Sequence, residues 1–225
     1  MTWKSLAQKI IKCEQCPWLR QYCCGIAEKK KPEFQDFTYW GKPVPGFGDP
    51  EAALWIVGLA PGAHGANRTG RMFTGDSSGD WLYSALNRFD FANQALSKSR
   101  EDGLRLKGVF ISAAARCAPP KNRPTVEELQ TCSVFLDEEY RLLQNKRVFL
   151  GLGKIGFESI LKLLKRQGIT LPSPIPKFLH GAIYEIHDYK LVASYHPSRQ
   201  NTNTGVLTKN MWEEIFRKTK ALTEA

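Results

Sequence analysis

The segment Ala53–Leu59, which reads ALWIVGL, is a short and almost uninterrupted apolar run. Such a run is typical of a β-strand that is covered on both faces, as the strands of parallel sheets are. Runs of the same character recur at Gly108–Ala114, Arg147–Leu152 and Lys190–Tyr195. A further run, Ala182–Ile186, lies just before the last of these, and we expect the two to form a hairpin at one margin of the sheet.

Segments with the 3.6-residue spacing of amphipathic helices lie between and after these runs. They are Ser77–Asn87, Val126–Gln144, Ile155–Arg166 and Val206–Leu222. The second begins with a capping box, because Thr125 and Glu128 can satisfy backbone N–H groups of the first turn. This alternation predicts a three-layer α/β/α fold with a central, mainly parallel four-stranded sheet, whose ligands bind at the carboxyl ends of the strands.

The composition favours one folded domain that spans residues 1–225. Of the 225 residues, 42% are apolar and 11% aromatic, which is enough for a sizeable core and excludes a disordered chain. No repeat or long linker divides the chain, and residues 1–50 are interpreted as an irregular, basic lead-in. The sequence shows neither a secretion signal nor the roughly 18 apolar residues of a membrane span, so we expect a cytoplasmic monomer.

The chain carries a formal net charge of +10, from 32 Lys and Arg against 22 Asp and Glu. Basic proteins bind nucleic acid through its phosphates and release counterions. The charge therefore indicates a polyanionic partner, although a basic surface that serves only solubility is the alternative.

Two pairs of cysteines have a spacing suited to metal binding. Cys13 and Cys16 form a C-x2-C pair, and Cys117 and Cys132 form a wider one. Four thiolates can hold a zinc ion or a 4Fe–4S cluster, and the wide second pair favours the cluster. A buried structural thiol is the alternative for Cys132, which falls in a predicted helix. Two adjacent cysteines, Cys23 and Cys24, are expected to be spare thiols, with the alternative that they replace Cys13 and Cys16 as ligands.

A glycine-rich segment follows the first strand, from Gly58 to Asp76, and reads GLAPGAHGANRTGRMFTGD. Five of its 19 residues are glycines, which allow close approach to the backbone. It lacks the Gly-Lys-Ser/Thr ending of a P-loop and the G-x-G-x-x-G spacing of a dinucleotide site. The segment is therefore interpreted as part of a pocket for a planar ligand.

Together with two later motifs, this segment resembles the uracil-DNA glycosylase superfamily, specifically its family 5 or type B branch, which carries an iron–sulfur cluster. The later motifs are RCAPPKNRPT at 116–125 and HPSRQNTNTG at 196–205, and the four cysteines are a fourth shared feature. The resemblance extends from Cys13 to about Thr208. It implies a uracil-DNA glycosylase-like fold and an enzyme that flips one base out of DNA and hydrolyses its bond to the sugar.

The resemblance assigns residues to four roles. The catalytic residues would be Asp76, Asn122 and His196. The base pocket would be lined by Gly58, Ala60, Pro61, Gly62, Ala63, His64, Phe73 and Asn201. The DNA-facing loop would present Ser198, Arg199 and Gln200. The 4Fe–4S cluster would be held by Cys13, Cys16, Cys117 and Cys132.

The implied roles follow from the chemistry of base excision. Phe73 would stack on the flipped base, which contributes about 1–3 kcal/mol. His196, preferably neutral, would stabilise the departing base, while Asp76 and Asn122 would hold water or stabilise the sugar cation. Ordinary alternatives remain: a core aromatic for Phe73, a helix N-cap for Asp76, a turn residue for Asn122, a histidine without a catalytic role for His196 and a solvated loop residue for Arg199.

The resemblance also implies what kind of glycosylase this is. Many superfamily members carry an acid or amide in the first motif, where this chain has Leu59 and Ala60, as fits the type B branch. We find no insert for covalent trapping of DNA and no activated lysine for a Schiff base, so water is the expected nucleophile.

Expected substrates of such a monofunctional enzyme are uracil, hydroxymethyluracil, ethenocytosine and hypoxanthine in DNA. A noncatalytic, metal-containing DNA-binding protein is the competing interpretation. A zinc hydrolase is a third, but four thiolates leave zinc no open position.

Overall fold

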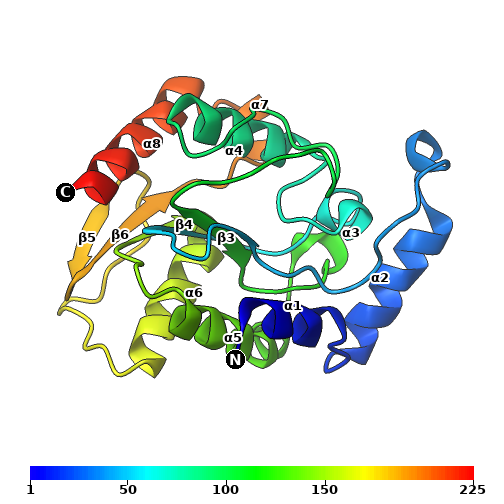
Figure 1. Ribbon diagram of the computed structural model, residues 1–225, viewed down its shortest axis with the longest axis horizontal. Helices are drawn as coiled ribbons and strands as arrows, with labels where there is room; N and C mark the ends of the chain where they lie inside the picture. The colour runs from blue at the N-terminus through cyan, green and yellow to red at the C-terminus, as the bar shows by residue number, and fades with distance from the viewer.

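Four buried strands form the parallel centre of one sheet (Figure 1). In the computed structural model, which describes residues 1–225, they are β2 (Leu54–Gly58), β3 (Val109–Ala113), β4 (Val148–Leu152) and β6 (Tyr189–Ser194). Every residue of β2, β3 and β4 is buried, as their continuous apolar sequences predicted. Because these strands are parallel, their carboxyl ends meet at one edge of the sheet.

Short antiparallel strands extend this sheet at both margins, so that it has six strands in the order β1-β3-β2-β4-β6-β5. β5 (Ile183–Ile186) pairs with β6, which confirms the expected hairpin. β1 (Phe47–Gly48) pairs with β3 and was not expected, because two residues are too few to show a periodic pattern. The predicted four-stranded sheet is thus the parallel part of a wider one.

Two pairs of helices cover the sheet, one pair on each face (Figure 1). The first pair is α4 (Ser77–Arg88) and α8 (Lys209–Glu224). The second pair is α5 (Val126–Leu142) and α6 (Gly153–Arg166). Each face of the sheet has its own hydrophobic core, and successive side chains of β2 point to opposite faces. Leu54 and Ile56 therefore belong to the core under the first pair of helices, and Trp55 and Val57 belong to the core under the second pair. The three-layer α/β/α prediction is confirmed.

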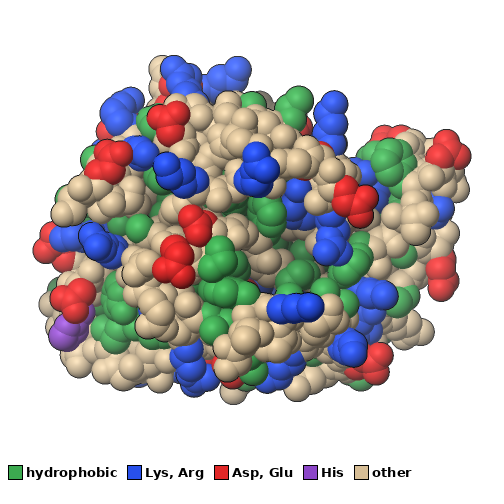
Figure 2. All heavy atoms as spheres, viewed as in Figure 1, with side chains coloured by type: hydrophobic (Ala, Val, Ile, Leu, Met, Phe, Trp, Pro, Cys, Tyr) green, Lys and Arg blue, Asp and Glu red, His purple; other side chains and the backbone are tan.

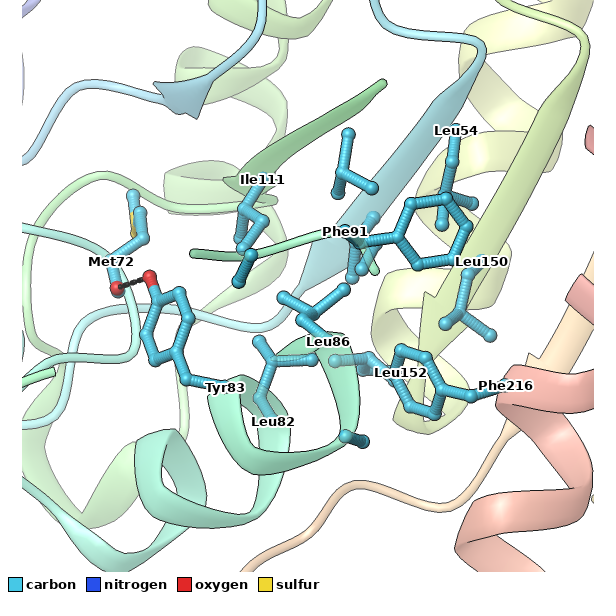
Figure 3. Packing of buried hydrophobic residues seen from close by; sticks show 14 of the residues in the cluster. Leu54, Met72, Leu82, Tyr83, Leu86, Phe91, Ile111, Leu150, Leu152 and Phe216 are labelled. Carbon is cyan, nitrogen blue, oxygen red and sulfur yellow. Dashed lines mark hydrogen bonds between the residues drawn. The ribbon is translucent and has the colours of Figure 1, made fainter. Parts of the chain in front are cut away.

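Figure 3 shows the core under α4, where Leu82 and Leu86 meet the strand residues Ile111 and Leu150. In the same cluster the Tyr83 hydroxyl donates a hydrogen bond to the carbonyl oxygen of Met72 at 2.7 Å. This bond joins the glycine-rich segment to a helix of the core. The predicted capping box is also present, with Thr125 and Glu128 bonded to each other's backbone N–H groups at 2.8 and 3.1 Å.

The N-terminal segment is helical, and its interpretation as an irregular lead-in was wrong. It forms α1 (Trp3–Ile11), α2 (Pro17–Lys29) and the short 3-10 turn η1 (Pro32–Phe34). Leu6 and Ile10 of α1 pack on Phe135 of α5, and Pro17 opens α2 at a position where its missing N–H is not needed. The apolar spacing in α1 covers only two turns, which is too short a pattern to distinguish a helix from a loop.

Short helical turns occupy the loops at the carboxyl edge of the sheet. They are α3 (Ala66–Thr69), η2 (Pro120–Asn122) and α7 (Arg199–Asn203). None of the chain's helices combines the length and apolarity needed to cross a bilayer.

Candidate active site and thiol site

The loops that follow β2, β3 and β6 surround a cavity of about 580 Å³. Its lining consists of Leu59, Ala60, Pro61, Gly62, Met72, Phe73, Asp76, Ser77, Ser78, Lys121, Asn122, Arg123, His196, Ser198, Arg199 and Gln200. All three expected catalytic residues and all three expected DNA-facing residues are in this set. Small-ligand sites commonly enclose about 300–1,000 Å³, so the cavity has room for one flipped nucleotide.

Phe73 forms one wall of the cavity, and its backbone is left-handed at φ +52°. Its ring lies over Gly58, where an added Cβ would come within 2.8 Å of Phe73 Cζ, so only glycine leaves room for the ring. The ring also stacks on the imidazole of His196, with centroids 5.7 Å apart and planes inclined by 25°. Phe73 is half-buried, so it packs against the core and still presents surface to the cavity.

Asp76 is both the N-cap of α4 and part of the cavity wall. Its Oδ1 accepts hydrogen bonds from the backbone N–H groups of Ser78 and Gly79, both at 3.0 Å. Its Oδ2 faces the glycine-rich segment, where a Cβ at Gly65 would lie only 2.0 Å from that oxygen. The cap therefore fixes the carboxylate while one oxygen stays directed toward Gly62 and Gly65, so the two interpretations of Asp76 are compatible.

His196 follows β6 and is enclosed by the cavity walls. Burial lowers the pKa of its imidazole to about 4, and the nearby charge of Asp76 only partly opposes this effect. The imidazole is therefore neutral at neutral pH, as expected, and carries one N–H donor and one acceptor.

Asn122 reaches the cavity through an unusual turn. Both Lys121 and Asn122 have left-handed backbones, at φ +53° and +54°. This conformation costs about 1–2 kcal/mol for an ordinary residue and less for Asn. The turn places three consecutive side chains, Lys121, Asn122 and Arg123, on the same cavity. Asn122 is therefore a turn residue, as the alternative held, and a cavity residue as well.

The mouth of the cavity is cationic. Lys121 and Arg123 lie on one side and Arg199 on the other, and all three are exposed. Arg199 Nε donates a hydrogen bond to Ser77 Oγ at 3.2 Å, which holds it beside the start of α4. Asp76 is the one acidic residue in the lining. Sequence reasoning missed Lys121 and Arg123, although their position on either side of Asn122 was a usable signal.

The four expected cluster ligands line a second, smaller cavity. Cys13 and Cys16 lie at the connection between α1 and α2, Cys117 follows β3, and Cys132 lies on α5. The same cavity is lined by Arg116, whose backbone N–H donates to Cys132 Sγ at 3.3 Å. Three separate parts of the chain therefore meet at this thiol site, defined here as these four cysteines.

Cys117 of this site is buried, and the other three cysteines are partly buried. Burial raises the pKa of Cys132 to about 12 and also raises that of Cys16. A hydrogen bond with Cys23, together with burial, raises the pKa of Cys117. Cys23 is buried behind Cys117, and its Sγ is 3.5 Å from the carbonyl oxygen of Ala118, so it packs instead of lining the thiol site.

Residues 45–220 match the sequence profile of the uracil DNA glycosylase superfamily. The chain belongs to this superfamily. The type-5 uracil-DNA glycosylase of Thermus thermophilus is 44% identical over 220 residues, which are 97% of this chain and 97% of that protein. That of Mycobacterium tuberculosis is 46% identical over 212 residues, 93% of this chain and 78% of the relative. The type-4 uracil-DNA glycosylase of Pyrobaculum aerophilum is 32% identical over 161 residues, 71% and 74% of the two chains.

In this member of the superfamily, four of the eight residues expected in the base pocket lie outside the cavity lining, and two of these face away from it. Ala63 packs toward Cys23, and His64 Nδ1 is hydrogen-bonded to the Tyr39 hydroxyl at 2.9 Å. Both face the N-terminal part of the chain because the glycine-rich segment turns into α3, which packs beside α2. Sequence reasoning could not foresee this contact, because the helices within residues 1–50 leave only weak local patterns.

Two more expected pocket residues act on the glycosylase cavity indirectly. Gly58 lies beneath Phe73 and makes room for its ring. Asn201 Nδ2 donates a hydrogen bond to the backbone carbonyl oxygen of His196 at 2.8 Å. Asn201 therefore supports the loop that carries His196, and its amide does not enter the lining.

Proposed function

We propose that this chain flips uracil, or a related deaminated or damaged base, out of DNA and hydrolyses its N-glycosidic bond. The products are the free base and an abasic site. The observation that carries the proposal is the convergence of Phe73, Asp76, Asn122 and His196 on one nucleotide-sized cavity. The type-5 relatives, which are uracil-DNA glycosylases by name, support the same activity.

Asp76 and Asn122 handle the water and the sugar. Cleavage leaves positive charge on the deoxyribose, which a nearby carboxylate stabilises. Because Oδ1 is occupied by the helix cap, Oδ2 is the oxygen of Asp76 that orients the attacking water and accepts its proton. The Asn122 amide supplies a second polar contact to the same water.

His196 stabilises the departing base. A neutral imidazole donates its N–H to a carbonyl oxygen of the base while negative charge develops there. Phe73 provides the stacking surface that replaces the neighbouring bases of the duplex. Ala60 and Gly62 add little bulk, which suits a broad range of damaged bases.

DNA binds at the cationic mouth of the cavity. Lys121, Arg123 and Arg199 contact phosphates, while Ser198 and Gln200 of the same loop as Arg199 face the duplex. Elsewhere the charges are mixed: on the face shown in Figure 2, Lys and Arg side chains are spread out among Asp and Glu. For DNA binding, the positive charge at the mouth of the cavity is therefore more important than the net charge of the whole chain.

The enzyme is monofunctional. The sequence led us to expect no activated lysine in the motifs, and the one lysine that lines the cavity is Lys121. A lysine nucleophile is activated by desolvation or a neighbouring cation, whereas Lys121 is exposed and placed at the mouth. Water is therefore the nucleophile.

The thiol site suits a 4Fe–4S cluster held by Cys13, Cys16, Cys117 and Cys132. A zinc ion would need sulfurs about 3.8 Å apart, from the tetrahedral Zn–S distance. No three Cys, His, Asp or Glu side chains in the chain are grouped for a single ion, whereas a four-iron cluster is a larger object that also takes four thiolates. When bound, the group supplies a cross-link between the N-terminal helices, the loop after β3 and α5. We also propose a cytoplasmic, monomeric protein.

A strand-cleavage assay tests the activity. A duplex with one uracil is incubated with the protein, and alkali is then added. Cleavage at the uracil is expected only after alkali, and no protein–DNA adduct is expected with borohydride. A duplex with thymine at that position is the control.

Binding without any alkali-labile site would leave a noncatalytic DNA-binding protein and overturn the proposal. An adduct with borohydride would instead overturn the monofunctional mechanism. Brown protein with about four iron atoms per chain is expected for the cluster, whereas colourless protein with one zinc would contradict it.

A further inference from the structure

Three arginine side chains are buried in this chain, and Arg68 differs from the other two. Arg71 pairs with Asp102 at 2.7 Å, and Arg116 pairs with Glu139 at 2.6 Å. Arg68 is only 7% exposed and takes part in no ion pair. Burial of a cation without a counter-charge is unfavourable, so the position of Arg68 needs an explanation.

Carbonyl oxygens and aromatic rings surround the guanidinium of Arg68 in place of a carboxylate. Its Nε donates to the carbonyl oxygen of His64 at 2.8 Å, and its Nη2 donates to that of Gly75 at 2.9 Å. The rings of Phe34 and Phe37 lie 4.1 and 4.9 Å from its central carbon. These contacts satisfy the donors and attract the charge to the ring faces.

The two carbonyl groups lie on either side of a stretch that leaves the cavity after Gly62 and lines it again from Met72. His64 follows the cavity wall at Gly62, and Gly75 immediately precedes Asp76. The contact at Gly75 is tight, since a Cβ there would lie 2.5 Å from Arg68 Nη2. Holding the Gly75 carbonyl fixes the peptide plane that joins Gly75 to Asp76, and with it the direction of the Asp76 side chain.

We propose that Arg68 is a positioning residue for Asp76, acting through the Gly75 carbonyl group while Phe34 and Phe37 cover the guanidinium. The N-terminal segment is thus part of the catalytic apparatus, although it does not reach the cavity. The inference rests on the proposed function, because it assigns a catalytic consequence to the geometry of Asp76.

A double-mutant cycle tests this inference. Arg68→Met should lower the single-turnover rate about a hundredfold with little change in KM, because small misplacements of a catalytic group can have effects of that size. Arg68→Lys should lower it about tenfold, because an ammonium group cannot span two carbonyls as a guanidinium does. In an Asp76→Asn background, either substitution should change the rate less than about twofold, because its effect is carried by the Asp76 carboxylate.

Stability and the wild type supply the controls. Leu163→Ala, in the buried face of α6 on the other side of the sheet, should lower the Tm and leave the rate unchanged. If Arg68→Met does not fold, the double-mutant cycle is measured with Arg68→Lys instead. Equal losses in the wild-type and Asp76→Asn backgrounds would make Arg68 purely structural and overturn the inference. An inactive wild type would be a separate result, which overturns the proposed function itself.

Discussion

The base cavity and the thiol site share the segment that follows β3, yet they are built in opposite ways. Asn122 enters the cavity from a strained turn whose geometry is set by its own backbone. Cys117, a few residues earlier, enters a buried site completed by cysteines from α5 and from the α1–α2 connection. The turn that presents Asn122 is therefore shaped by its own backbone, whereas each thiol reaches its partners only while distant parts of the chain stay together.

The largest effect is expected at the thiol site. Cys117→Ala should destabilise the protein by about 4 kcal/mol, because loss of a metal ligand is among the changes with the greatest effects on stability. Cys24→Ala, at an exposed thiol, should leave the Tm unchanged. Iron content and thermal unfolding measure both variants. Full iron content and an unaltered Tm in Cys117→Ala would show that Cys117 does not hold the cluster.

In the cavity, Asp76→Asn should separate stability from catalysis. Asn is as good an N-cap as Asp, so the free energy of unfolding should change by less than about 0.5 kcal/mol. The rate of base release should fall about a hundredfold to a thousandfold, because the carboxylate is lost. Single-turnover kinetics and denaturant unfolding are the measurements. Retained activity would mean that Asp76 only caps the helix.

A smaller catalytic effect is expected from Gly65→Ala. The new Cβ would lie 2.0 Å from Asp76 Oδ2 and 2.9 Å from its Cγ, so the carboxylate must move. We expect a loss of about tenfold or more in rate.

Gly25→Ala is the matched control for that substitution. Gly25 lies in α2, where an added Cβ would meet no atom within 4 Å. The substitution should stabilise the helix by about 0.5–1 kcal/mol without slowing the reaction. Equal rates in the two glycine variants would remove the argument that local backbone shape sets the cavity.

A separate effect on stability is expected from pH. Because burial lowers the pKa of His196 to about 4, an unfolded histidine near 6.5 takes up its proton first as the pH falls. The contribution of His196 to stability is present above pH 6.5 and declines between about pH 6.5 and 4, by at most about 1.4 kcal/mol per pH unit. His196→Asn should show a shallower decline in denaturant unfolding across this range. Identical pH profiles would contradict a buried neutral imidazole.

The contrast between the two regions also explains what the sequence could predict. The parallel strands were predictable because full burial leaves continuous apolar runs such as ALWIVGL at 53–59. Since motifs that follow such strands meet at one edge, the convergence of Asp76, Asn122 and His196 followed from their positions. The grouping of the four cysteines around one cavity also agrees with the expected set, while their ligand stays a prediction.

What the sequence could not predict depends on contacts between distant segments. The direction of His64 is set by Tyr39, and the confinement of Arg68 depends on Phe34 and Phe37. All three partners lie within residues 1–50, after two short helices of the kind that packing stabilises more than local sequence does. Lys121 enters the cavity because its backbone is left-handed, and a lysine in the sequence does not predict that conformation.

The near-parallel rings of Phe73 and His196 have a consequence for selectivity. A base that stacks on Phe73 lies almost parallel to the imidazole, whose N–H bond is in its own plane. In the proposed reaction the imidazole would therefore meet the rim of the base, where oxo and amino substituents differ between normal and altered nucleobases, while Phe73 would accept any flat heterocycle. On this geometry the choice between bases would depend on the polar groups that face the rim of the base, and substitutions among them would change the preferred base without disturbing the stacking surface.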